Sequence, residues 1–249
     1  MITRHHIVLA LICALIACSS FVFKNPLLAI IFCAGTCTGA ILPDIHMSRP
    51  KKFVFRTLTW LVVQLPRQIC APVLSRISAC TGYPATGPSD KRLTHSVPGI
   101  LFITACAGLF LYVPAISVNR AVAGDVALFL AGLLLGMGLH LAEDLCTRKG
   151  IFPFFPFSRE KIAGSIRPCD QTDTRIAWYH VQHGSILLLL LFLERTGIIA
   201  PALALPVSLA GLTACLGIMV YFSDVTIRKD PGPAGTMMRS IPVKSTGRL

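Results

Sequence analysis

Apolar residues occur along this chain in long, nearly uninterrupted stretches rather than in the one-faced or alternating patterns of water-soluble folds. Six stretches are bounded mostly by charged residues, proline or glycine, and we expect helices at residues 7–23, 26–43, 97–115, 124–142, 176–193 and 198–222. About 20 apolar helical residues cross the roughly 30 Å hydrocarbon core of a bilayer. The pattern therefore predicts an all-α fold, a polytopic transmembrane helical bundle of about six spans.

Two of these spans leave an alternative open. The fifth reaches spanning length only if Trp178 and Tyr179 lie at the membrane interface, so a count of five remains possible. Residues 1–20 also resemble a cleaved signal peptide, with Arg4 as the basic start. Because the apolar run continues past Cys18 to Phe23, the sequence favours a retained first span.

The composition supports a membrane domain and excludes an ordinary soluble one. Hydrophobic residues make up 54% of the chain and charged residues only 14%, against about 25% charged in soluble domains. We expect one transmembrane domain over 1–225 and a basic, disordered cytoplasmic tail over 226–249. Between spans two and three, residues 52–66 mix apolar residues with Arg56, which predicts a short helix lying in the membrane interface.

The positive charges predict the orientation of the bundle. The formal net charge is +12, and six spans sort 20 of the 23 Lys and Arg residues to one side. Only Lys24, Arg120 and Arg195 fall on the other side. The positive-inside rule then places both termini in the cytoplasm. An excess of cations that sets orientation needs no nucleic acid, so we expect membrane lipids and no nucleic acid as partners.

Histidine and acidic residues gather where three spans meet the cytoplasmic side. Span two ends at Pro43-Asp44-Ile45-His46, and a proline disfavours the helical conformation of the residue before it. The residues that follow are therefore expected to be extended, with Asp44 and His46 on one side. Ser96 is expected to cap span three, which holds His95 just outside that helix.

Near the end of span four, His140 and Asp144 are four positions apart and share one helical face. Carboxylate oxygens with imidazole nitrogens suit Zn²⁺, Mn²⁺ or Fe²⁺. We therefore expect a divalent metal ion, Zn²⁺ or Mn²⁺ by preference. The predicted metal ligands are Asp44, His46, His95, His140 and Asp144.

Other polar residues are less strongly predicted to belong to this metal site. Glu143 is one position off the face of His140, which makes it an interfacial or supporting residue. His180 and His183 begin span five and either join the site or belong to the polar interface. The alternative for the whole pattern is a set of contacts with lipid headgroups. The ten cysteines form no CxxC pair, and we expect no disulfide bonds. The glycines at 35, 39, 132, 136 and 138 are expected to allow close helix packing.

These motifs resemble the YdjM-like inner-membrane proteins of bacteria, a family described as predicted membrane-bound metal-dependent hydrolases. The resemblance covers about residues 1–157 and is most specific from Gly136 to Pro156, which fits G-x-x-x-H-x-x-x-D-x-x-T-x-x-G followed by an aromatic-proline end. Thr94-His95-Ser96 and Leu42-Pro43-Asp44-Ile45 match two further motifs. The family also has a histidine near its N-terminus, to which His5 or His6 would correspond.

The chain departs from the family pattern at two places. It reads Pro43-Asp44-Ile45-His46-Met47 where P-D-x-D-H is common, and Asp90-Lys91-Arg92 where a His-Arg pair often precedes T-H-S. These departures leave the expected fold unchanged but bear on how completely a metal would be held.

The resemblance implies a multi-pass protein of the bacterial inner membrane and a metal-dependent hydrolase. The depth of the site at the cytoplasmic headgroups favours a small-molecule or lipid substrate such as a lipid-linked ester or phosphoester. Asp144 or Glu143 would act as the catalytic general base. The alternative is a non-catalytic metal-binding or ion-translocating membrane protein. A translocation path would place ionisable groups along the middle of several spans, and these are nearly absent there. A one-sided site, and hence an enzyme, is favoured.

Overall fold

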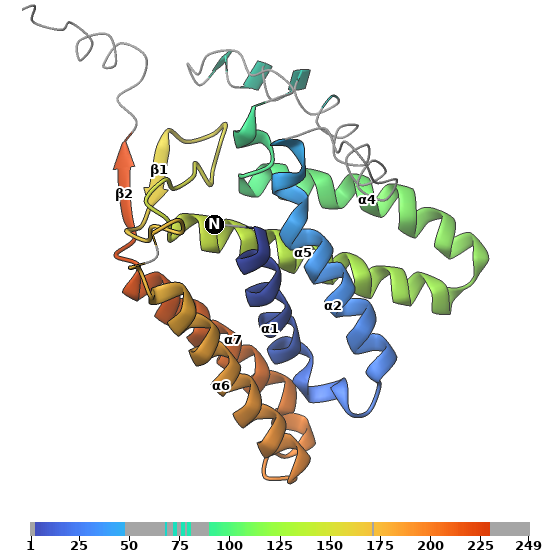
Figure 1. Ribbon diagram of the computed structural model, residues 1–249. Helices are drawn as coiled ribbons and strands as arrows, with labels where there is room; N and C mark the ends of the chain where they lie inside the picture. The colour runs from blue at the N-terminus through green and yellow to red at the C-terminus, as the bar shows by residue number, and fades with distance from the viewer. Residues whose placement is uncertain are drawn as a thin grey trace, which may run out of the picture.

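Six long apolar helices form the protein (Figure 1) in a computed structural model that describes residues 3–47, 90–170 and 172–229, with isolated positions between 68 and 80. The helices are α1 (Thr3–Val22), α2 (Pro26–Ile41), α4 (Val97–Val118), α5 (Arg120–Leu145), α6 (Arg175–Arg195) and α7 (Pro201–Phe222). All six are long and apolar enough to cross a membrane, which confirms the six-span fold. The interfacial helix expected at 52–66 lies outside the described residues.

Helix α1 contacts α2, α5, α6 and α7, and α5 packs against both α2 and α4. Figure 1 shows the helices spreading apart from the end of the bundle that carries two short 3₁₀ helices, η1 (Leu42–Met47) and η2 (Lys91–Leu93). The core around α1 is apolar and contains Ala10, Cys13, Ile16, Leu187 and Leu212. The first residues of α1, the last of α5 and the two 3₁₀ helices therefore meet at one end.

Glycines let α2 and α5 approach more closely than any other residue would allow. A Cβ atom at Gly39 would collide with the backbone carbonyl of Leu133, and one at Gly136 would collide with that of Thr36. Gly35 and Gly132 make equivalent approaches one turn further along. The predicted role holds for these four glycines but not for Gly138, which faces open space.

The connections differ from the predicted ones in two places. Helices α4 and α5 are separated by one residue, Asn119, whose side chain accepts a hydrogen bond from the backbone N–H of Val122 at 2.8 Å. Because this asparagine caps α5, both helices run further than the apolar pattern alone indicates.

The prediction that the chain is extended after Pro43 is wrong. Leu42 is right-handed helical at φ −56° and ψ −42°, its N–H bonds to the carbonyl of Thr38, and residues 42–47 form η1. The preference of a pre-proline residue is only a bias, and the hydrogen bonding of α2 overrides it.

A small antiparallel sheet joins two segments that are distant in sequence. Strand β1 (Glu160–Ala163) pairs with β2 (Thr226–Lys229), with Glu160 opposite Lys229. The first four residues of the expected 226–249 tail are thus a strand rather than disordered, and residues 230–249 lie outside the described part of the chain. The sheet ties the segment after α5 to the segment after α7.

Candidate metal centre

The end of α5 supplies two polar side chains to the site. His140 is fully buried, Asp144 is 8% exposed, and His140 Nε2 lies 3.7 Å from Asp144 Oδ2. The close approach of α2 to α5 brings the carbonyl of Ala40 to 2.7 Å from His140 Nδ1. A carbonyl only accepts hydrogen bonds, so Nδ1 carries the proton and Nε2 presents its lone pair to the site.

His95 enters the site from the turn that precedes α4. Ser96 caps α4 as predicted, accepting a hydrogen bond from the N–H of Gly99 at 3.2 Å. His95 Nδ1 lies 3.2 Å from the carbonyl of Lys91 and 3.0 Å from the hydroxyl of Thr94. The Lys91 carbonyl fixes the proton on Nδ1, which leaves Nε2 of His95 facing Nε2 of His140 at 3.3 Å.

Asp44 completes the group from η1. One of its oxygens lies 3.4 Å from His95 Nε2 and the other 4.0 Å from His140 Nε2. The hydroxyl of Thr94 donates to the carbonyl of Pro43 at 3.2 Å, which attaches η1 to the turn that carries His95. Lys91 Nζ approaches Asp44 from outside at 3.3 Å.

The four side chains have the arrangement of a metal-binding site. Four donors at about 2.0–2.2 Å from a tetrahedral ion lie about 3.3–3.6 Å from one another. His95 Nε2, His140 Nε2 and Asp144 Oδ2 lie 3.3–3.7 Å from one another, and Asp44 approaches the two histidines at 3.4 and 4.0 Å through different oxygens. Both imidazoles are oriented by carbonyls behind them, as metal-ligating histidines usually are. His95, His140 and Asp144 therefore fit one divalent cation, and Asp44 lies beside them.

A fifth side chain, His6 of α1, also reaches the cluster. Its ring stacks on that of His140 with centroids 4.0 Å apart, and its Nε2 lies 3.7 Å from Asp144 Oδ1. Asp44, His6 and His140 form a second group of donors within 4.8 Å of one another. Both ring nitrogens of His6 are buried without a hydrogen-bond partner among the described residues. Such buried polar atoms are costly unless something pairs with them.

Behind His6 lies Glu143, which is 1% exposed. Its Oε2 is 2.7 Å from His6 Nδ1, although the two atoms are not aligned as a hydrogen bond. Glu143 therefore approaches Nδ1 of His6, whereas Asp144 approaches Nε2 of His6 as well as His95 and His140. Glu143 was expected to be an interfacial or supporting residue; it is buried rather than interfacial, and its contact with His6 was not predicted.

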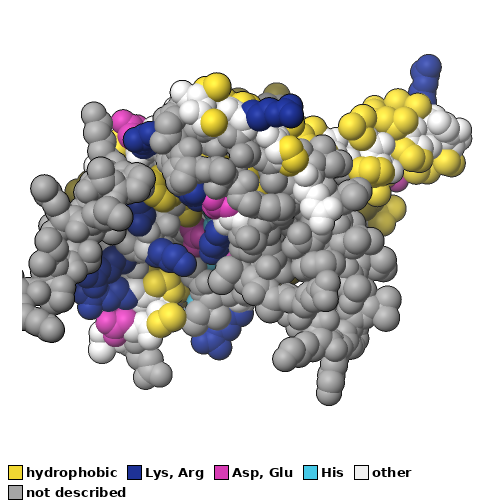
Figure 2. All heavy atoms as spheres, turned by 90° about the horizontal axis from the view of Figure 1, so that it is seen from above, with side chains coloured by type: hydrophobic (Ala, Val, Ile, Leu, Met, Phe, Trp, Pro, Cys, Tyr) yellow, Lys and Arg dark blue, Asp and Glu magenta, His cyan; other side chains and the backbone are white. Residues whose placement is uncertain are grey.

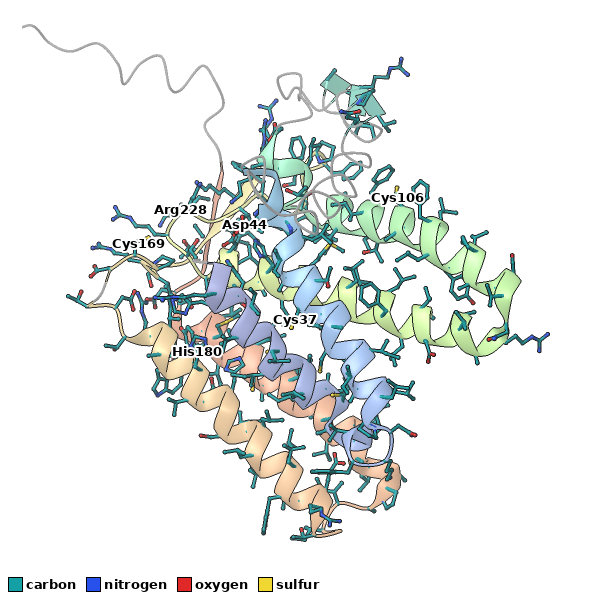
Figure 3. The ribbon with its side chains drawn as sticks, turned by 45° about the vertical axis from the view of Figure 1, so that its right-hand side comes forward. Cys37, Asp44, Cys106, Cys169, His180 and Arg228 are labelled. Carbon is teal, nitrogen blue, oxygen red and sulfur yellow. The ribbon has the colours of Figure 1, made fainter. Side chains whose placement is uncertain are left out.

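The remaining candidate residues are not members of the donor groups found among the described residues. The backbone of His46 lies in η1, but its side chain is outside the described part of the structure. His180 pairs with His5 at a ring-centroid distance of 5.6 Å, and Figure 3 shows it on α6, apart from Asp44. His183 is fully buried in the core. Burial raises the pKa of the Cys146 thiol to about 11, so this nearby cysteine stays neutral and is a poor ligand.

The motif residues after Asp144 turn the chain back beneath the site. The hydroxyl of Thr147 donates to the carbonyl of Asp144 at 2.8 Å and accepts from the N–H of Gly150 at 3.3 Å. Gly150 has φ +58°, a conformation that glycine adopts without strain. Phe155, at the aromatic-proline end, is fully buried against Leu93 beside the turn that carries His95.

Comparison with known proteins places this architecture in a family. No curated protein and no solved structure matches the chain. The model of the family described as YdjM inner membrane protein matches residues 1–223, which include all six helices and every described donor of the cluster. The chain therefore belongs to the YdjM family of inner-membrane proteins.

Proposed function

We propose that this protein is a membrane-bound, metal-dependent hydrolase that cleaves an ester or phosphoester at the membrane end that carries η1 and η2. The observation that carries the proposal is the convergence of His95, His140 and Asp144 at 3.3–3.7 Å, with Asp44 3.4 and 4.0 Å from the two histidines. Both imidazole Nε2 atoms are directed inward by carbonyls on Nδ1.

Asp44, His95, His140 and Asp144 would hold the ion, for which Zn²⁺ or Mn²⁺ best matches two nitrogen and two oxygen donors. A bound ion of this kind polarises a substrate oxygen and lowers the pKa of a coordinated water toward about 7. Asp44 of η1 has the most exposed side chain of the four, at 20%, against 0–11% for the others, so the site is most accessible on the side of η1. A substrate would enter from that end of the bundle.

His6 is the residue best placed to accept a proton in this site. Glu143 faces its Nδ1 at 2.7 Å, and its Nε2 faces the cluster at 3.7 Å from Asp144. A carboxylate behind one ring nitrogen favours the tautomer whose other nitrogen is free to act as a base. In this proposal His6 takes the role of general base that was predicted for Asp144 or Glu143. Glu143 orients His6, and Asp144 acts as a ligand.

Cations around the opening favour an anionic substrate. Figure 2 shows Lys and Arg side chains around a hollow in which acidic and histidine side chains are visible. Lys91 lies beside the site, with a side chain one-third exposed and Nζ 3.3 Å from Asp44. A phosphoester entering here would meet this ammonium before it reached the donors. The depth of the site at the ends of membrane helices suits a lipid-linked phosphate, and the charge distribution of the chain assigns this end to the cytoplasm.

The alternative, a metal-binding protein that transports ions, is less well supported. Between the cluster and the opposite end of the bundle, the core contains Ala10, Cys13, Ile16, Leu187 and Leu212. Such an apolar interior offers few groups to replace the hydration shell of a crossing ion.

The test is hydrolysis by the purified full-length chain, stripped with chelator and reloaded with Zn²⁺ or Mn²⁺. Long-chain phosphomonoester, phosphodiester and carboxylic ester probes would be compared in detergent micelles. We expect metal-dependent release of product and its loss in His6→Gln, with metal content retained. A protein that binds metal stoichiometrically but hydrolyses none of the three probe classes would exclude the enzyme and favour the alternative.

A further inference from the structure

A polar cavity lies at the other end of the bundle, where α1 and α6 end and α7 begins. Its volume is about 360 Å³, and Ser19, Phe23, Lys24, Glu194, Arg195 and Pro201 are among the residues that line it. The metal centre is built from the beginning of α1 and the end of α5, so the cavity lies a whole helix length away from it. It belongs to the opposite surface of the membrane domain.

The floor of the cavity is a buried hydrogen-bonded network. Ser19 of α1 and Ser208 of α7 are 1% and 0% exposed, with their hydroxyl oxygens 2.7 Å apart. Oε1 of Glu194 accepts from Ser19 at 3.1 Å and lies 3.4 Å from the hydroxyl of Ser208. Three helices thus hold one carboxylate group at the cavity. Burying polar groups among apolar helices costs free energy, so a network of this kind indicates a functional site.

The charged side chains that line the cavity form no close ion pair with one another in the described part of the chain. In the described part of the chain, no Lys or Arg nitrogen lies within 4.0 Å of a Glu194 oxygen, although Lys24 and Arg195 line the same cavity. These two are also unusual by position. Spans sort only three cations to this side of the membrane, and two of the three line this one cavity.

We propose that this cavity binds the headgroup of a phospholipid that carries both a primary ammonium and a phosphate. Glu194, fixed by the two serines, would accept hydrogen bonds from the ammonium group, and Lys24 and Arg195 would contact the phosphate. Helix ends lie at headgroup depth, so the cavity is where such a group resides in a bilayer. Phe23 and Pro201 provide an apolar rim for the glycerol and the first acyl carbons.

The experiment uses the delipidated full-length protein and measures lipid binding by native mass spectrometry. The probes are phosphatidylethanolamine, phosphatidylglycerol, which lacks the ammonium, and phosphatidylcholine, whose quaternary ammonium has no N–H. Soluble glycerophosphoethanolamine carries the same headgroup without acyl chains. We expect phosphatidylethanolamine to bind about tenfold more tightly than either other lipid, the value of one charge-assisted hydrogen bond, and the soluble headgroup to bind far more weakly.

Three variants separate specific from general lipid contact. Glu194→Gln should abolish the preference for phosphatidylethanolamine while leaving phosphatidylglycerol binding unchanged. The double variant Lys24→Gln/Arg195→Gln changes two exposed side chains, so folding should be retained. It should weaken the binding of phosphatidylethanolamine and of phosphatidylglycerol about tenfold. Arg120→Gln, the third cation of this side, lies outside the cavity and should have no effect.

Equal affinity for all three lipids would overturn the proposal, as would an Arg120→Gln effect as large as that of the double variant. If glycerophosphoethanolamine bound as tightly as phosphatidylethanolamine, the proposal of a lipid ligand would be wrong, and the cavity would be a site for a soluble zwitterion. None of these outcomes depends on hydrolytic activity at the other end of the bundle.

Discussion

Replacement of His140 by alanine removes one donor of the four that surround the candidate ion. It also removes the hydrogen bond at 2.7 Å that joins α5 to the carbonyl of Ala40 on α2. Loss of a group that only supports a ligand costs about 10–100-fold in metal affinity, so loss of a direct ligand should cost at least about 100-fold. The buried Ala40 carbonyl would be left without this partner, at a cost of about 1–3 kcal/mol in stability.

That cost should not prevent folding, because α2 and α5 remain packed through Gly39 and Gly136. The matched control is His183→Ala, since His183 is equally buried but belongs to no donor group. Both variants lose a buried imidazole, and only one should lose metal. The assay is a competitive chelator titration of the purified proteins with Zn²⁺ and Mn²⁺, at matched monodispersity. Wild-type affinity in His140→Ala, or an equal loss in His183→Ala, would refute the assignment.

Three further predictions follow from the same geometry. Gly136→Ala should push α2 away from α5, because overpacking of this kind costs about 1–3 kcal/mol, and should lower metal affinity at least tenfold. Gly138→Ala should bind metal like wild type, and equal behaviour of the two variants would contradict the packing argument. Lys91→Met should lower kcat/KM for a phosphoester probe about tenfold and leave a neutral ester within about twofold, so a uniform loss would count against anion recognition. Reporter fusions at Arg195 and Arg167 should report the periplasm and the cytoplasm, respectively, and the reverse pattern would invert the proposed orientation.

The sequence predicted the parts of the site that depend on local geometry. His140 and Asp144 share a face because a helix repeats about every 3.6 residues, and the six spans follow from apolar length alone. Ser96 caps α4 because serine is a favoured residue at that position. For these residues, neighbours along the chain determine the structure.

His6 could not be chosen over His5 in this way, because its role depends on where α1 packs. A signal was nevertheless present in the sequence. His6 shares its helical face with Ala10, Cys13 and Ala17, small residues that are all buried, whereas Val8 on the neighbouring face is 46% exposed. A stripe of small residues indicates the packed side of a membrane helix. By this rule, the packed face of α1 is the face that carries His6.

Residues whose structure depends on distant partners were not predicted. The conformation of Leu42 follows from the hydrogen bonds of α2 rather than from Pro43. Strand β2 forms only because β1 is present, and neither strand is long or apolar enough to be recognised alone. The contact between Glu143 and His6 likewise joins the two ends of separate helices.

The sheet in which Glu160 lies opposite Lys229 can form only after the ribosome has synthesised β2. The ribosome adds about 5–20 residues per second, so strand β1 waits roughly 3–13 s for its partner after its own synthesis. During that interval, the loop that follows Asp144 and Thr147 lacks the strand that later anchors it. The donors on α1, η1, the turn before α4 and α5 are all synthesised before β2, but the segment that follows α5 is the last to be anchored. Ion capture by the nascent chain should therefore be weaker than by the finished protein, and a chain truncated at Phe222 should retain that immature state.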